Sequence, residues 1–166
     1  MDSTFQKIKL IALTASIFSL SPYLAAETLK KCSSAPLMVS SKNVGTMTYH
    51  AENCQKSWDS QSVQLDFAYQ TDIPEWAFKR AASYFLKKNV PEFSQTSALD
   101  RITQLYKPVK KGDFYRLTYQ QASKKLNLSL NQSSLGSIVD ERANQYFKIW
   151  FGEAPFNAKL KQQLLN

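Results

Sequence analysis

The sequence predicts one α+β domain: an open-faced antiparallel β-sheet, or sandwich, with helices packed on one face. Three observations lead to this fold class. Several short segments alternate apolar and polar residues with the period of a β-strand, amphipathic helical segments lie between and after them, and only a short turn separates the strand segments 113–120 and 125–131, as in an antiparallel hairpin. A chain of 166 residues without repeats suits a single domain.

Residues 1–26 have the layout of a secretory signal peptide. Lys7 and Lys9 precede an apolar stretch over 10–24, and Ala25 and Ala26 form a small-residue cleavage site. The alternative, an uncleaved membrane anchor, needs a longer apolar run. We therefore expect an exported protein, periplasmic or secreted, with an N-terminal segment over 27–43 and the folded domain over 44–166.

Cys32 and Cys54 are the only cysteines. In an oxidising compartment an even number of cysteines favours a disulfide, although two free thiols remain the alternative. His50 is the only histidine, and neither cysteine has the spacing of a zinc site, so no metal site is expected.

The formal net charge is +8, and the basic residues are dispersed, mostly in pairs such as Lys87 and Lys88. Pairs near the ends of elements are typical of solvated lysines. We expect no nucleic-acid partner, while weak contact with lipid head groups stays open.

The clearest strand is 62–70, where Val63, Leu65, Phe67 and Tyr69 alternate with more polar residues. The segments 113–120 and 125–131 are separated by a short turn and predict an antiparallel hairpin. Further strands are expected at 44–52 and 133–138.

The first helix is predicted to start at Asp72 and Pro74 and to end before Pro91. Helical spacing places one set of residues on its inward face: Ala77, Ala81, Tyr84 and Phe85.

Three more helices are expected. One covers 97–106, the next runs from Asp140 to a left-handed stop at Gly152, and the last is capped by Asn157. Phe147, Trp150 and Phe151 would face the core from the third helix, or line a ligand cavity beside it.

Five segments in order resemble the chalcone isomerase-like family, specifically its small exported bacterial branch. They are "LDFAYQTDIP" (65–74), "KKGD" (110–113), "LGSI" (135–138), "IWFGEAP" (149–155) and "KLKQQLL" (159–165). The resemblance covers about 44–165. It implies an open-faced sheet wrapped by helices, with an apolar cleft between them.

The resemblance also implies where an isomerase would hold the developing negative charge of its substrate. True isomerases of the family use an arginine near the start of the domain, a threonine and a tyrosine in the cleft, and a second threonine in the C-terminal helix. Thr46 and Tyr49 match the cleft pair, but the first arginine here is Arg80, and Ile149 replaces the second threonine. Thr71 stands where the family often has a further arginine, so chalcone isomerase activity is not expected.

The leading hypothesis is a non-catalytic protein that binds a small apolar or amphiphilic molecule, such as a fatty acid, in the cleft. Its candidate ligand-binding residues are Thr46, Tyr49, Tyr69 and Trp150. Arg80 or Arg116 could replace the missing arginine as an anchor for a carboxylate. No cofactor is expected, and no catalytic residue is assigned.

Two alternatives remain open. One is an envelope structural or interaction protein without a small ligand. The other is an isomerase or lyase of unknown substrate, for which Tyr49, His50 and Tyr69 are the only candidate acids or bases. A solid core would favour the first alternative, whereas an enclosed apolar cavity of roughly 300 Å³ or more would favour ligand binding. The oligomeric state is not predicted.

Overall fold

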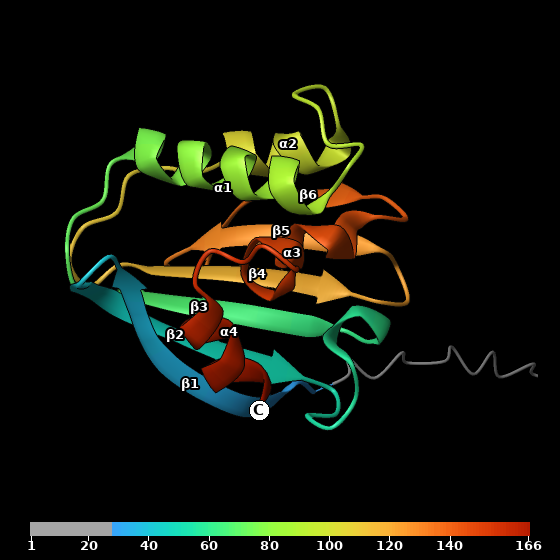
Figure 1. Cartoon of the computed structure of the whole chain (residues 1–166). Helices are drawn as coiled ribbons and strands as arrows, with labels where there is room; N and C mark the ends of the chain where they lie inside the picture. The colour runs from blue at the N-terminus through green and yellow to red at the C-terminus, as the bar shows by residue number, and fades with distance from the viewer. Residues whose placement is uncertain (1–27) are drawn as a thin grey trace, which may run out of the picture.

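The computed structural model describes residues 28–166 (Figure 1). The signal-peptide prediction for residues 1–26 lies outside this range. In the described part of the chain no helix is both long and apolar enough to cross a membrane.

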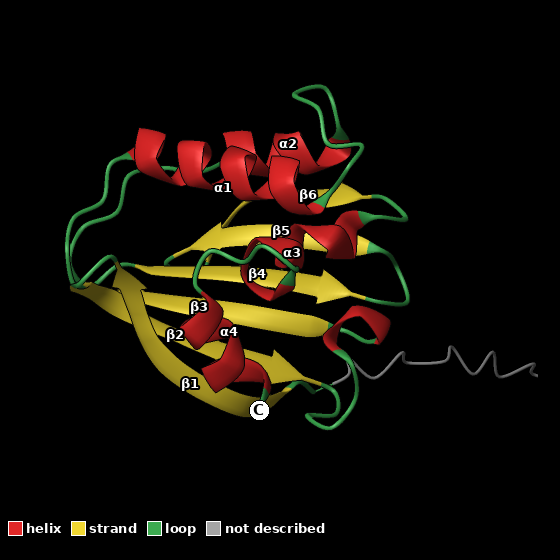
Figure 2. Cartoon of the chain, in the orientation of Figure 1, coloured by secondary structure: helices red, strands yellow, loops and turns green. Residues whose placement is uncertain are grey.

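Six strands form one antiparallel sheet in sequence order, so every strand pairs with its neighbours along the chain. The helices gather on one face of this sheet (Figure 2). The predicted fold class is thus confirmed. The strands are β1 (Lys30–Val39), β2 (Lys42–Ala51), β3 (Val63–Tyr69), β4 (Phe114–Gln120), β5 (Lys125–Leu130) and β6 (Ser133–Val139).

Strand β1 was not predicted, and it extends the sheet into the segment assigned to residues 27–43. Its sequence, KKCSSAPLMV, contains two serines in its centre and a proline, which is why the pattern is weak. A proline is compatible with an edge strand, where the missing N–H donor leaves no neighbour unpaired. Leu37 and Ala35 nevertheless point into the core.

Four helices and two 3₁₀ turns accompany the sheet. Helices α1 (Glu75–Asn89) and α2 (Ala98–Gln104) connect β3 to β4, and α4 (Ala158–Leu165) packs against β1. The third helix is shorter than predicted, since a 3₁₀ turn, η2 (Ala143–Phe147), leads into α3 (Lys148–Phe151). The other 3₁₀ turn is η1 (Trp58–Ser60).

The start and the inward face of α1 differ from the prediction. Pro74 occupies the N-cap position without a side-chain cap, and Asp72 binds elsewhere. The most buried residues of the helix are Ala82 and Leu86, whereas Tyr84 is 51% exposed. The true inward face is therefore displaced from the predicted one.

Gly152 ends α3, but in an extended conformation with φ of −70° rather than the predicted left-handed one. A side chain at this position would collide with that of Asn89, which binds both the N–H and the C=O of Ala154 at 2.8 Å. Glycine is needed here because the end of α1 comes close. The predicted cap of α4 is confirmed, since the side chain of Asn157 accepts a hydrogen bond from Leu160 N at 2.9 Å.

Alternation along the strands gives the sheet two different faces. Residues such as Leu65 and Phe67 face the helices and form the core. The opposite face is polar, and at its centre Arg116 holds Asp66 through two hydrogen bonds, Nε–Oδ1 at 2.8 Å and Nη2–Oδ2 at 2.9 Å. An apolar ligand cavity is therefore expected on the face of the sheet that the helices cover.

Candidate ligand cavity

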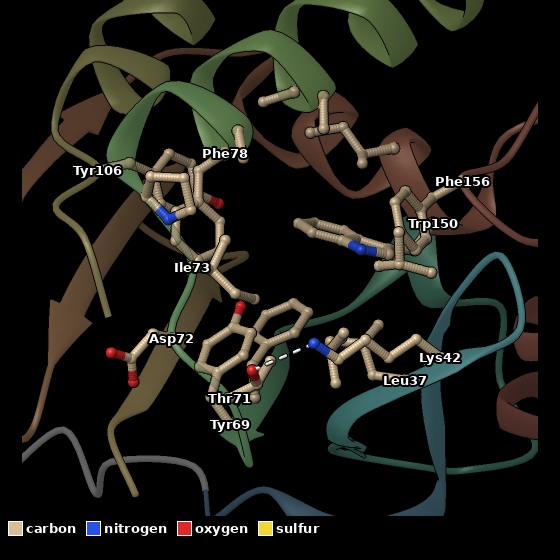
Figure 3. A pocket seen from close by; sticks show the side chains of 18 residues that line it. Leu37, Lys42, Tyr69, Thr71, Asp72, Ile73, Phe78, Tyr106, Trp150 and Phe156 are labelled. Atoms are coloured by element: carbon tan, nitrogen blue, oxygen red, sulfur yellow. Dashed lines mark hydrogen bonds between the residues drawn. The ribbon is translucent and has the colours of Figure 1, made fainter. Parts of the chain in front are cut away.

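An apolar cavity of about 310 Å³ lies between the sheet and α1 (Figure 3). Its floor comes from β1, β2 and β3, its roof from α1, and its far wall from α3 and the loop before α4. The main apolar lining residues are Leu37, Val44, Phe67, Tyr69, Ile73, Ala77, Phe78, Ala81, Ala82, Tyr106, Ile149, Trp150 and Phe156.

The cavity exists because α1 presents small side chains where a core helix normally presents large ones. Ala77, Ala81 and Ala82 line the space. On the same helix, the larger Phe78 packs edge-on against Tyr69 of β3, with 5.6 Å between the ring centres. An interior that is otherwise closely packed therefore leaves a space of ligand size at this point.

Aromatic rings make the walls rigid. The Phe67 and Trp150 rings lie 5.1 Å apart, and Phe78 contacts Tyr69 edge-on at 5.6 Å and stacks on Tyr106 at 5.3 Å. Such pairs hold each other in a fixed orientation. The cavity is thus framed by side chains that have little freedom to collapse into it.

The polar groups of the cavity gather at its mouth. The Lys42 ammonium lies 3.5 Å from the Thr71 hydroxyl, and Figure 3 shows the two side chains pointing toward each other. Asp72 lies at the same rim, but it accepts hydrogen bonds from Lys110 Nζ and from the backbone N–H of Lys111, both at 2.9 Å.

These hydrogen bonds keep Asp72, the one carboxylate among the described lining residues, ionised and paired with Lys110. The hydrogen bond from Lys110 contributes most to lowering the pKa of Asp72, and the bond from the Lys111 N–H comes second. Lys42 makes no ion pair within residues 28–166. The mouth therefore carries one uncompensated positive charge next to an apolar interior.

The remaining titratable groups of the cavity stay uncharged. Burial raises the pKa of Tyr69 and of Tyr106 well above the ordinary value for tyrosine. A general acid or base works best with a pKa near the operating pH. Neither tyrosine meets this condition, and neither does Asp72, whose pKa is lowered.

The four residues predicted to bind ligand fall into two groups. Tyr69 and Trp150 line the cavity. Tyr49 is buried behind it, where its ring packs edge-on against Phe151 at 5.4 Å and burial raises its pKa to about 12. Thr46 lies on the opposite face of β2, paired in register with Ala68, and does not contribute to the cavity.

The two arginines considered as anchors also lie away from the cavity. Arg116 belongs to the polar face of the sheet and is engaged by Asp66. Arg80 lies on the outer side of α1, where its side chain is exposed. Lys42 is the one lysine or arginine among the described lining residues of the cavity, and no sequence motif marked it.

Thr71 and Ile149, two positions where the sequence departs from the family's isomerases, both line the cavity. Thr71 supplies a hydroxyl at the mouth, and Ile149 supplies an apolar side chain in the interior.

Cys32 and Cys54 form a disulfide, with a Cα–Cα distance of 5.4 Å. It ties the start of β1 to the loop that follows β2, and so confirms the predicted pairing. No cluster of potential metal ligands exists among residues 28–166.

The comparisons with known proteins agree with this architecture. No curated protein matches the chain. Among solved structures, a fatty-acid binding protein from Arabidopsis thaliana matches with a TM-score of 0.64 and 12% identity, covering 85% of this chain and 88% of that one. At this identity the likeness concerns the fold. The sequence profile described as chalcone isomerase-like matches residues 46–166, and the chain therefore belongs to the chalcone isomerase-like family.

Proposed function

We propose that this protein binds a small amphiphilic molecule of fatty-acid type in the cavity and does not convert it chemically. The observation that carries the proposal is the combination of an apolar interior of about 310 Å³ with a single uncompensated cation, Lys42, at its mouth. Ligand pockets of proteins begin at about this size and combine apolar walls with a few placed polar groups.

The arrangement supports one orientation of the ligand. An alkyl chain would fill the space between α1 and the sheet, against Trp150 and Phe67. An acidic head group would stay at the rim, where Lys42 and Thr71 can both donate hydrogen bonds to it. The fold of the Arabidopsis fatty-acid binding protein is compatible with this proposal.

Non-catalytic binding is supported by the cavity's own chemistry. Tyr69 and Tyr106 are held in the neutral form, and Asp72 is held in the ionised form by its two donors. The described lining residues include no histidine or cysteine. An isomerase or lyase reaction would require a group poised to exchange a proton near neutral pH.

We also propose that the protein works outside the cytoplasm, in the periplasm or after secretion. The disulfide Cys32–Cys54 supports an oxidising compartment. The signal-peptide pattern of residues 1–26 supports export independently.

Native mass spectrometry tests the binding proposal. The protein is produced from its complete sequence, purified without detergent, and weighed intact before and after organic extraction. We expect one molecule of an acidic lipid per chain, released by extraction. An unliganded mass that does not change on incubation with fatty acids, phospholipids and phenolic compounds would refute ligand binding and favour an envelope interaction protein.

A further inference from the structure

The outer side of α1 carries an exposed aromatic and basic stripe. Trp76 is 65% exposed and Tyr84 is 51% exposed, and Arg80 lies between them. Spacings of four residues place all three on one side of the helix. Lys87 and Lys88 continue the stripe toward the end of α1, and both are exposed.

The stripe is positively charged and carries no carboxylate of its own. The Lys88 ammonium lies 4.6 Å from the centre of the Tyr84 ring, a cation–π contact that leaves its charge available. Glu75, the one acidic residue of α1, is on another side of the helix and is paired with Lys79. Basic and aromatic residues therefore stand side by side without acidic neighbours on the same helix.

This stripe borders the cavity. Trp76, Arg80 and Tyr84 line an open depression on the outside of α1, and Ala77 and Ala81 line both this depression and the cavity. Val39, a further exposed apolar residue at 47%, lies at the cavity rim on the end of β1.

Four large apolar residues are exposed among those the structure describes. Val39 lines the cavity, whereas Trp76 and Tyr84 line the depression on the outer side of α1. The fourth, Val139, lines neither hollow. Three of the four thus line one of the two hollows that share Ala77 and Ala81.

We propose that the outer face of α1 docks on the surface of an anionic lipid bilayer. Tryptophan and tyrosine favour the boundary between head groups and acyl chains, because each has an apolar ring and a polar edge. Arg80, Lys87 and Lys88 complement anionic head groups. This docking goes beyond the proposed ligand binding.

Sedimentation with lipid vesicles tests the docking. The protein made from the complete sequence is mixed with vesicles of phosphatidylcholine alone or of phosphatidylcholine with phosphatidylglycerol. We expect binding only to the anionic vesicles. The double substitution W76S/Y84S should weaken it about tenfold, and each of R80Q and K87Q should weaken it about fivefold.

The matched control is V139S, which removes an equally exposed apolar side chain away from the cavity and should leave vesicle binding unchanged. Equal binding by wild type, W76S/Y84S and V139S would overturn the proposal. A dimer in solution that W76S/Y84S dissociates would overturn it as well, since the stripe would then belong to a contact between two copies.

Fluorescence quenching shows which part of the protein meets the lipid. The chain has three tryptophans; Trp150 is 8% exposed and Trp58 is half-buried, so Trp76 is the exposed reporter. Brominated lipids in the vesicles should quench the wild type strongly and W76F weakly. Vesicle binding without quenching of Trp76 would contradict docking through α1. This readout needs no cavity ligand, so its failure leaves the binding proposal standing.

Discussion

The Lys42 ammonium lies 3.5 Å from the Thr71 hydroxyl, across the ends of two neighbouring strands. Lys42 opens β2, and Thr71 lies two residues after the end of β3, so the pairing of these strands brings the two side chains to the same rim of the cavity. A carboxylate placed there can accept hydrogen bonds from both. This pair defines where the head group of the proposed ligand would lie.

Replacement of Lys42 by Met should therefore weaken the binding of fatty acids selectively. We expect the dissociation constant for a long-chain acid to rise about tenfold, because a hydrogen bond to a charged group at an exposed site is lost. The matching alcohol should bind K42M and wild type equally, and K42R should retain acid binding. Equal weakening for acid and alcohol would show that Lys42 does not recognise the head group. Calorimetric titration measures all three variants.

Filling the cavity should abolish binding without harm to the fold. Ala82 is 4% exposed and lines the cavity, so the larger side chain of A82L can occupy the empty space. We expect A82L to lose ligand binding and to unfold at a temperature equal to or above that of the wild type, since apolar area is buried without displacing neighbours. Calorimetry without ligand measures the unfolding.

The control for A82L is A68L, on the exposed face of β3 away from the cavity. It should bind ligand normally. Retention of full binding by A82L would place the ligand somewhere other than this cavity.

Loss of the disulfide should destabilise the domain. Cys32 and Cys54 are 22 residues apart, and closing a loop of this length stabilises the fold by about 3 kcal/mol in the chain-entropy model. Urea unfolding of the wild type should shift to lower urea on addition of a reductant. The C32S/C54S variant should unfold at the same urea concentration as the reduced wild type, with or without reductant. A wild type that unfolds at the same urea concentration with and without reductant would contradict a stabilising role of the disulfide.

His50 should give the fold a pH-dependent stability. Burial is the largest cause and lowers its pKa. Asp66, whose Oδ2 lies 3.8 Å from Nδ1, acts in the opposite direction, while Arg116 and Lys31 add to the lowering, and the net effect is a lowered pKa.

The unfolded chain thus takes up a proton at His50 more readily than the native chain does. The contribution of His50 is complete above the unfolded pKa of about 6.5, and it is lost as pH falls toward the lower native value. Urea titrations between about pH 5 and pH 8 should show stability decreasing in this window for the wild type and a flatter profile for H50Q. An identical slope in both proteins would assign the effect to other groups.

The sheet was predictable because its central strands alternate with a period of two and face a core on one side only. The edge strand β1 could not be predicted, because Ser33, Ser34 and Pro36 interrupt its apolar pattern. Its extended conformation depends on its pairing with β2. The inward face of α1 was misread at Tyr84 for a related reason. An aromatic side chain suits either a core or a surface, and only the fold shows that Ala82 and Leu86 are buried while Tyr84 is exposed.

The candidate site was harder to predict than the fold. Tyr69 and Trp150 were found because large aromatic residues on inward faces border any space between sheet and helix. The cavity itself results from three alanines on α1, which in a sequence look like ordinary helix formers. Lys42 follows a tight turn, where a lysine is common, and its position at the rim depends on the pairing of β2 with β3.

We expect a fatty-acid-like ligand to lie in this cavity with its head group at Lys42. A crystal structure of the protein with a fatty acid brominated at its terminal carbon tests this placement, since anomalous scattering locates the bromine. We expect a bromine peak in the interior beside Trp150 and a carboxylate within hydrogen-bonding distance of Lys42. Bromine at the mouth, on the polar face of the sheet, or nowhere in the protein would contradict it.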